Sequence, residues 1–282
     1  MITTFTTSGF KCFTQPTTFH FARFNLLTGY NGRGKSSVLQ ALLLLSQSIK
    51  KYGHVETLSP SGCFLKLGSF GDILSEQRKV MTFNFQCLDE IVELKYRTPS
   101  KSSWNGEICS LKINGTEYFE QSSDLSSSII LKTTTPKSIN TSYPKDFYNS
   151  LENFYYISAD RLGPTLFEEK EEIINNNPLG CRGEHKLNML ANNEELLPTI
   201  AGILEYIMDG GRLSIIGSEE KNEVISSYFS FQNFNKNIKA VNVGYGYSYI
   251  LPIIVLSQTI SNGAIFIENP EAHLHPMAQS KL

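Results

Sequence analysis

Residues 24–52 read FNLLTGYNGRGKSSVLQALLLLSQSIKKY. Residues 17–28, TTFHFARFNLLT, contain an alternating run that ends in the apolar NLLT, which is typical of a strand that enters a glycine-rich turn. From Ser36 onward, helix-forming residues place apolar side chains at helical spacing, and lysines near the end complement the negative end of the helix dipole. The stretch therefore predicts the order strand, glycine loop, helix.

Within this stretch, residues 29–36, GYNGRGKS, match the pattern GxxxxGK[ST]. Glycines let the backbone wrap a phosphate with several N–H groups pointing inward, and the following helix adds its positive end. In this pattern Lys35 reaches the β- and γ-phosphates, and the Ser36 hydroxyl ligates Mg²⁺. A glycine-rich turn without a ligand is the alternative, and the flanking elements favour a site for ATP and Mg²⁺. Its predicted contacts come from Gly29, Asn31, Gly32, Arg33, Gly34, Lys35, Ser36 and Ser37.

A second candidate is the acidic end of an apolar strand in residues 263–271, GAIFIENPE. In P-loop enzymes a carboxylate at the end of a neighbouring strand helps to hold Mg²⁺. Glu268 stands at that position, although a buried strand with a solvated acidic turn would look similar. His273 and His275 follow, but zinc needs three or four ligands and no further histidine or cysteine is nearby. We expect these histidines to lie in a turn.

Composition narrows the classes of function. The chain has 282 residues, with 40% hydrophobic and 18% charged residues and a net charge of −2. A chain of this length and hydrophobic content can form one elaborated domain or two domains, each with a buried core. Its net charge lacks the excess of basic residues that is typical of a plain nucleic-acid-binding domain. The five cysteines form no CxxC pair, which argues against a disulfide framework. Neither a signal peptide nor a membrane-length apolar run is visible, so we expect a cytoplasmic protein without membrane partners.

The remaining elements follow from periodicity and turn residues. We predict a strand over 2–8, antiparallel strands over 78–135 and a strand that enters a Gly-Pro turn over 154–164. Residues 173–193 read as an exposed loop. Residues 194–208 and 246–260 read as helices.

Several stretches resemble the SMC/RecF/OLD-like branch of ABC-type ATPases, and most closely bacterial AAA-type ATPases with an EqPE-x-HLHP variant of the Walker B motif. They are GFKCF (9–13), NLLTGYNGRGKSS (25–37), LKLGSFGDIL (65–74), YYISADRLGP (155–164), NVGYGYSYILPIIV (242–255) and ENPEAHLHP (268–276). The resemblance implies an α/β P-loop NTPase of ABC/RecF-like type, with a mainly parallel core sheet and an antiparallel β-rich insertion. The expected divisions are 1–77 (core with phosphate loop), 78–165 (insertion), 166–240 (loop and helical lobe) and 241–282 (signature-like helix and Walker B).

In such ATPases two copies pair head to tail, and a signature segment of one caps the ATP held by the other. The resemblance implies a homodimer of this kind, with Gly244, Gly246 and Ser248 as the candidate signature. Glycines, a hydroxyl and a helix start also make an ordinary turn and N-cap. Two candidates remain for the element that senses magnesium, Gln47 and the Gly68–Asp72 turn, and the sequence does not decide between them.

The Walker B region departs from the usual Asp-Glu ending. Here the two positions are Glu268 and Asn269, and an amide cannot accept a proton as a carboxylate does. Either Glu271 supplies the base, or turnover is slow and the chain is a nucleotide-gated regulatory subunit. The resemblance implies an ATPase in a DNA-related or phage-defence process, with DNA or a nuclease as a partner.

The resemblance also implies a strand after Walker B that lies between it and the phosphate-loop strand. The segment AHLHPMAQSKL reads instead as a turn and a helix start. Unpaired backbone groups in the middle of a sheet would be costly. We therefore expect residues 1–282 to be a fragment, or to need another polypeptide, and not to be a competent ATPase alone.

Overall fold

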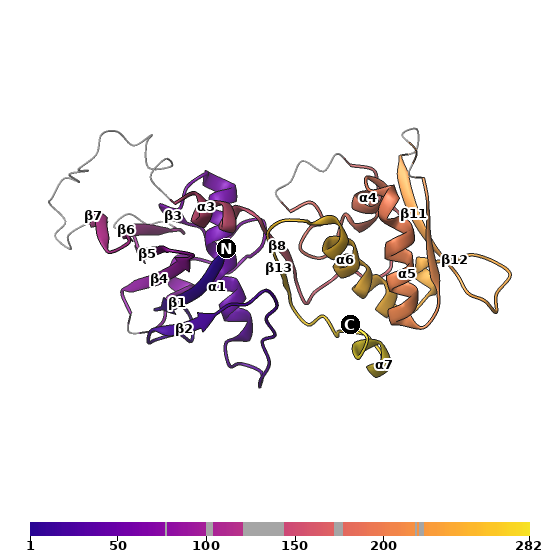
Figure 1. Cartoon of the computed structure of the whole chain (residues 1–282), viewed down its shortest axis with the longest axis horizontal. Helices are drawn as coiled ribbons and strands as arrows, with labels where there is room; N and C mark the ends of the chain where they lie inside the picture. The colour runs from indigo at the N-terminus through magenta and orange to yellow at the C-terminus, as the bar shows by residue number, and fades with distance from the viewer. Residues whose placement is uncertain (77, 100–103, 121–143, 172–176, 218, 220–222) are drawn as a thin grey trace. The chain divides into compact units, whose positions relative to one another are not determined.

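The computed structural model describes residues 1–76, 78–99, 104–120, 144–171, 177–217, 219 and 223–282 (Figure 1). It divides into two compact units, residues 1–154 and 155–282, and each is described by itself. None of the helices in the described part is long and apolar enough to cross a membrane. All five cysteines lie in described residues, and none of them forms a disulfide there.

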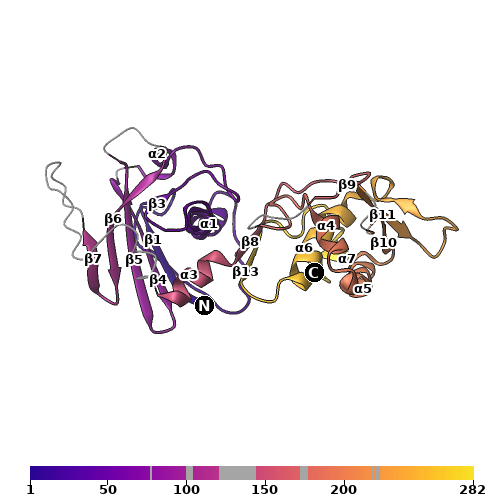
Figure 2. The same cartoon turned by 90° about the horizontal axis from the view of Figure 1, so that it is seen from above.

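Unit 1 is built on a seven-stranded antiparallel sheet in the order β2-β1-β4-β5-β6-β3, with β7 also paired to β6. Its strands are β1 (Ile2–Ser8), β2 (Thr17–His20), β3 (Thr57–Leu58), β4 (Val80–Cys87), β5 (Glu90–Arg97), β6 (Gly106–Ile113) and β7 (Thr116–Glu120). Its helices are α1 (Lys35–Tyr52), α2 (Phe70–Ile73) and α3 (Lys145–Glu152). Figure 2 shows α1 and α3 on one face of the sheet.

Alternation along the strands explains this sheet. In β4 the side chains of Met81, Phe83 and Phe85 are buried, and the residues between them are more exposed. Phe5 of β1 lies opposite Phe85, and their ring centroids are 4.9 Å apart. Such cross-strand aromatic pairs stabilise one face of a sheet. The predicted strands at 2–8 and between 78 and 120 are confirmed, whereas the part of that prediction over 121–135 lies outside the described residues.

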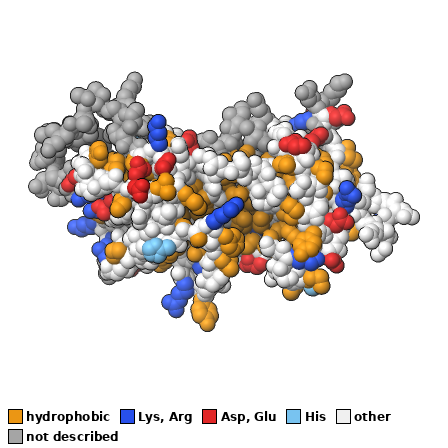
Figure 3. All heavy atoms as spheres, viewed as in Figure 1, with side chains coloured by type: hydrophobic (Ala, Val, Ile, Leu, Met, Phe, Trp, Pro, Cys, Tyr) orange, Lys and Arg blue, Asp and Glu red, His pale blue; other side chains and the backbone are white. Residues whose placement is uncertain are grey.

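The strand predicted over 17–28 is confirmed only at its start, where β2 covers Thr17–His20. Residues 21–34 form no strand, and Phe24 and Leu26 are 83% and 70% exposed. Figure 3 shows hydrophobic side chains at the tip of this loop, below unit 1. An apolar run becomes a strand only when a neighbour pairs with its backbone, and none of the described strands pairs with this segment.

Unit 2 combines helices with two small sheets. Its strands are β8 (Phe154–Ile157), β9 (Glu168–Glu169), β10 (Arg212–Ile216), β11 (Val224–Ser230), β12 (Ile238–Lys239) and β13 (Ala264–Ile267). Its helices are α4 (Lys186–Ala191), α5 (Leu197–Met208), α6 (Tyr245–Thr259) and α7 (Pro276–Gln279), with 3₁₀ turns η2 (Glu194–Leu196) and η3 (Ala240–Asn242). Strands β9 to β12 form an antiparallel sheet around β11, and β8 pairs with β13.

The core of unit 2 comes from α4, α5 and α6, which contribute buried Leu190, Leu204 and Leu251 among others. The predicted helices at 194–208 and 246–260 are confirmed, as is the helix start near the C-terminal end. The expectation of a mainly parallel core sheet is wrong for the described residues. The large sheet is antiparallel and begins with β1, and the parallel part is the two-stranded β8–β13 sheet. The division into a core, an insertion and two further lobes stays a prediction.

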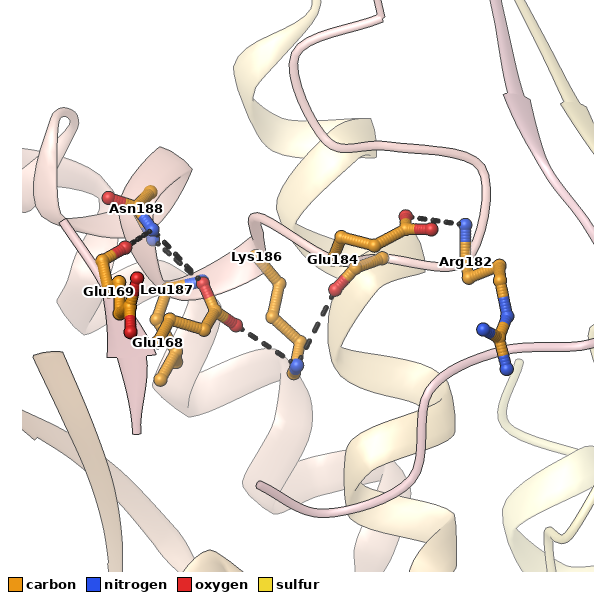
Figure 4. Close-up of polar contacts among 8 residues, drawn as sticks. Glu168, Glu169, Arg182, Glu184, Lys186, Leu187 and Asn188 are labelled. Atoms are coloured by element: carbon orange, nitrogen blue, oxygen red, sulfur yellow. Dashed lines mark hydrogen bonds and ion pairs between the residues drawn. The ribbon is translucent and has the colours of Figure 1, made fainter. Parts of the chain in front are cut away.

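The prediction of an exposed loop over 173–193 is also wrong where the structure describes it. Helix α4 is buried there, and the Lys186 ammonium donates to Glu168 Oε1 at 3.0 Å (Figure 4). The other oxygen, Glu168 Oε2, accepts from the backbone N–H groups of Leu187 at 2.8 Å and Asn188 at 3.2 Å. The polar residues of this segment predicted a loop. Their partner Glu168 lies about 20 residues earlier in the chain, and a local sequence pattern does not show such a contact.

Candidate functional site

The phosphate loop joins residues 21–28 to helix α1 in unit 1. Gly29, Gly32 and Gly34 adopt φ values of 133°, 76° and 89°, a region that residues with a Cβ rarely enter. A Cβ on Gly29 or Gly32 would meet nothing within 4 Å, whereas one on Gly34 would lie 2.8 Å from Cys12 Sγ. The first two glycines are therefore required by backbone conformation, and Gly34 also by close packing.

Helix α1 presents an uncapped N-terminus to this loop. No side chain caps its first turn, the turn contains no acidic residue, and the helix is 18 residues long. Asn31, Arg33 and Ser36 are exposed around it, and Ser37 is half-buried. Unpaired N–H groups and the helix dipole make such an end attractive to an anion.

Lys35 lies at the start of α1 and folds back over the loop. Its Nζ donates to the carbonyl oxygens of Gly29 at 2.7 Å and Tyr30 at 2.9 Å. The ammonium thus points at the residues that the pattern assigns to phosphate. A bound phosphate would exchange these neutral acceptors for charged ones, which form stronger hydrogen bonds.

The acidic turn in unit 2 begins where β13 ends. The Glu268 N–H donates to the Ile157 carbonyl at 3.0 Å, which fixes the main chain beside β8. The Tyr156 hydroxyl donates to Glu268 Oε2 at 2.9 Å. Burial first, and then the charge of Glu268, raises the pKa of Tyr156, so this hydroxyl remains a donor. Within the described part of the chain, Glu268 Oε1 is buried without a hydrogen-bond partner.

Asn269 and Glu271 lie close together after Glu268. Asn269 adopts φ 45°, which asparagine tolerates better than most residues. Its Nδ2 donates to Glu271 Oε1 at 3.1 Å, and Glu271 is exposed. The three predicted catalytic residues therefore share one turn, with the carboxylate of Glu271 already bonded to the amide of Asn269.

The two histidines of this turn make packing and capping contacts. The ring of His273 lies 4.3 Å from that of Tyr249, between centroids, and His275 Nδ1 accepts from the N–H of Met277 at 3.3 Å. Among the described residues, no group of three or more histidine, cysteine, aspartate or glutamate side chains could hold a metal. His273 therefore lies in a turn, as expected, and His275 caps the start of α7.

Arg161 is the residue of this region that the pattern analysis missed. It is 2% exposed, and its Nη2 donates to the carbonyl oxygen of Glu268 at 3.2 Å and to that of Asn269. Its Cζ lies 5.4 Å from the centroid of the Tyr249 ring. Burial lowers the pKa of the guanidinium. The stretch YYISADRLGP contains this arginine, but a sequence gives no sign that the side chain is buried.

The signature candidates occupy different environments at the start of α6. Gly244 is the exposed N-cap residue of the helix. Gly246 is buried, and a Cβ there would lie 3.0 Å from the His273 carbonyl oxygen. Ser248 is 4% exposed. Of these three residues, Gly244 alone is on the surface of unit 2, and the role of the segment stays a prediction.

Both positions left open as magnesium sensors are engaged within unit 1. Gln47 is fully buried, its Nε2 donates to the Ser59 carbonyl at 2.6 Å, and its Oε1 accepts from the Leu65 N–H at 2.9 Å. Asp72 Oδ2 accepts from the N–H and hydroxyl of Ser69, each at 2.7 Å, and hydrogen bonding lowers the pKa of Asp72. These contacts hold neighbouring loops in place.

A family model described as "AAA domain, putative AbiEii toxin, Type IV TA system" matches residues 24–282. The chain belongs to this family. This match confirms the resemblance drawn from the motifs. The chain is an AAA domain of the ABC-type, SMC-like P-loop ATPases.

Solved structures agree at the level of fold. One is an SMC head bound to the C-terminal winged-helix domain of ScpA. It is 12% identical with a TM-score of 0.52, over 99% of this chain and 91% of that one. Another is an SMC head with an extended coiled coil bound to the C-terminal domain of ScpA, from Pyrococcus furiosus. It has the same identity and TM-score, over 99% of this chain and 84% of that one. No curated protein sequence matches this AAA domain.

The residues present fit the ligands that the family implies. The phosphate loop of the AAA domain offers an uncapped helix end, exposed Ser36 and the ammonium of Lys35. In unit 2, Glu268 offers a buried carboxylate oxygen that lacks a hydrogen-bond partner among described residues. Hydroxyl and carboxylate oxygens are the ligands that Mg²⁺ prefers.

Proposed function

We propose that this AAA domain binds ATP with Mg²⁺ and that two copies pair around the nucleotide. Lys35 and the N–H groups of residues 29–37 would hold the phosphates, and Ser36 would bind the metal. Glu268 is proposed as a further metal ligand from its place in the Walker B pattern. Mg²⁺, when bound, neutralises phosphate charge and orients the transferred group. The observation that carries the proposal is the glycine loop that leads into the uncapped end of α1, in a chain of a P-loop ATPase family.

We further propose that the domain hydrolyses ATP slowly, with Glu271 as the base. The support is chemical: Glu271 is the exposed carboxylate of the turn, and its partner Asn269 is an amide that cannot take a proton. The same asparagine favours a second candidate function, a nucleotide-gated regulatory subunit with little turnover. Single-turnover hydrolysis, measured with and without DNA, separates the two candidates.

The family description supports the biological setting that we propose. It names a toxin of a type IV toxin–antitoxin system, which fits a role in phage defence or a related DNA process. The SMC heads of similar fold are bound to a domain of ScpA. By analogy, a separate protein domain, a nuclease or DNA would be the partner that nucleotide binding controls.

The first test is Lys35→Ala. Removing the ammonium should weaken ATP binding by about 1.5–3 kcal/mol, roughly ten- to 150-fold, because charge-assisted hydrogen bonds to phosphate have this strength. Isothermal titration calorimetry measures the affinity. Lys66→Ala, at an exposed lysine of the same unit, is the matched control and should bind as the parent does. Equal affinity of a folded Lys35→Ala variant rejects the phosphate loop.

A further inference from the structure

The turn that follows β13 adopts an unusual backbone. Asn269 and His273 have φ values of 45° and 61°, and neither is glycine. Left-handed conformations at such residues persist only where the surroundings hold them. The turn begins at Glu268, so its conformation decides where that carboxylate points.

Arg161 is the side chain that holds the first part of this turn. Its Nη2 donates to both main-chain carbonyls, those of Glu268 and Asn269, and its guanidinium lies against the ring of Tyr249. Tyr249 in turn contacts the ring of His273. The arginine therefore acts on both left-handed residues, one directly and one through an aromatic ring.

The hydrogen bonds of Arg161 do not involve the side-chain carboxylate of Glu268. Arg161 Nη2 donates to main-chain oxygens, whereas Oε2 of Glu268 accepts a hydrogen bond from the Tyr156 hydroxyl. In the part of the chain that is described, Oε1 has no hydrogen-bond partner, nor do Nε and Nη1 of Arg161. An arginine paired with the carboxylate itself would compete with a cation, and this arrangement avoids that competition.

We propose that Arg161 is a positioning residue for the metal-binding carboxylate: it fixes the Glu268–Asn269 main chain and thereby sets the direction of the Glu268 carboxylate, which would bind Mg²⁺. The inference rests on the proposed function and adds a residue outside both the phosphate loop and Walker B. Partners of this kind orient metal ligands without touching the metal, and their loss typically lowers metal affinity about ten- to 100-fold.

The test measures the affinity for ATP by calorimetry, once in Mg²⁺ and once in EDTA. The ratio of the two affinities is the gain that Mg²⁺ gives. Arg161→Met keeps the length of the side chain and removes its donors. We expect the gain to fall about tenfold, with the affinity in EDTA within about twofold of the parent. Arg161→Lys, whose ammonium can still donate to the two carbonyls, should restore part of the gain. Arg212→Met, at an exposed arginine of the same unit, is the matched control.

The outcomes separate this inference from the function on which it rests. A folded Arg161→Met variant with an undiminished gain overturns it, as does an equal loss of affinity with and without Mg²⁺, which would show a general structural role. If Arg161→Met does not fold, Arg161→Gln takes its place under the same criterion. A parent chain that binds no ATP overturns both, whereas a parent with a normal response to Mg²⁺ and to Lys35→Ala leaves the proposed function standing.

Discussion

At the residue scale, Asn269 stands where the usual Walker B motif ends in glutamate, and its Nδ2 donates to the nearby carboxylate of Glu271. If Glu271 is the base, Glu271→Gln should slow single-turnover hydrolysis about 100-fold or more, the ordinary contribution of a general base. Asn269→Glu should speed it, because a carboxylate then stands at the usual position. Rapid-quench assays with protein in excess over ATP measure the rate, and Glu195→Gln, at an exposed acid of unit 2, is the control. An unchanged rate in Glu271→Gln would leave Glu271 as a turn residue only.

A buried ion pair gives a second prediction at this scale. Lys186 and Glu168 are both buried and their charged atoms lie 3.0 Å apart. Lys186→Met leaves the carboxylate of Glu168 buried without its counter-charge, which costs about 3–5 kcal/mol. Thermal unfolding followed by circular dichroism should show a lower midpoint than for Lys239→Met, at an exposed lysine. Equal midpoints would mean that the backbone N–H groups of α4 suffice to hold Glu168.

The sequence motifs predicted some residues of the candidate site, but not the residues that contact Glu268 from distant parts of the chain. Lys35 and Ser36 follow from fixed spacing, because the chemistry of phosphate binding requires neighbours in sequence. Arg161 and Tyr156 reach Glu268 from more than a hundred residues away. Such contacts depend on how strands pair, and no local pattern contains that information.

At the element scale, the start of α6 bears on the proposed dimer. Gly244 is exposed, with φ −61° and ψ 147°, and a Cβ there would meet nothing within 4 Å. Gly244→Arg should therefore fold and block ATP-dependent pairing if this segment faces a second copy. Ser248→Arg is less informative, because Ser248 is buried and the arginine would disrupt the core.

Light scattering with and without ATP measures this pairing. Gly202→Arg, at an exposed glycine of α5 whose Cβ would also meet nothing within 4 Å, is the matched control and should pair as the parent does. Equal pairing of Gly244→Arg and Gly202→Arg would remove the start of α6 from the interface. Loss of pairing in both would show that an added charge anywhere on unit 2 is enough to disrupt it.

Periodicity predicted those elements that bury one face. The helices α1, α5 and α6, and the strands β1, β4 and β5, lie where the patterns placed them. It failed for residues 24–28, whose apolar side chains have no strand partner in the described structure, and for α4, whose polar side chains are buried by pairing with each other. The direction of the main sheet was also missed, because the resemblance supplied a parallel core and strand pairing is not a local property.

At the scale of the whole molecule, we predict that the 282-residue chain does not turn over ATP steadily by itself. The phosphate loop follows residues that no described strand holds in a sheet, so its backbone lacks the rigid support that positioning requires. A steady-state phosphate-release assay, with a thermal melt of the same sample, tests this expectation. Cooperative melting together with hydrolysis that Lys35→Ala abolishes would contradict it.

The exposed segment before the loop has a consequence for any measured affinity. Residues 21–34 have no ladder of backbone hydrogen bonds, and Phe24 and Leu26 bury little surface. Segments with few buried contacts open at low free energy and exchange their amide hydrogens early. When phosphate fixes the loop, each residue that becomes ordered costs about 1–2 kcal/mol of backbone entropy. The dissociation constant for ATP is therefore a net quantity, and anything that orders residues 24–28 beforehand should tighten nucleotide binding without touching the nucleotide.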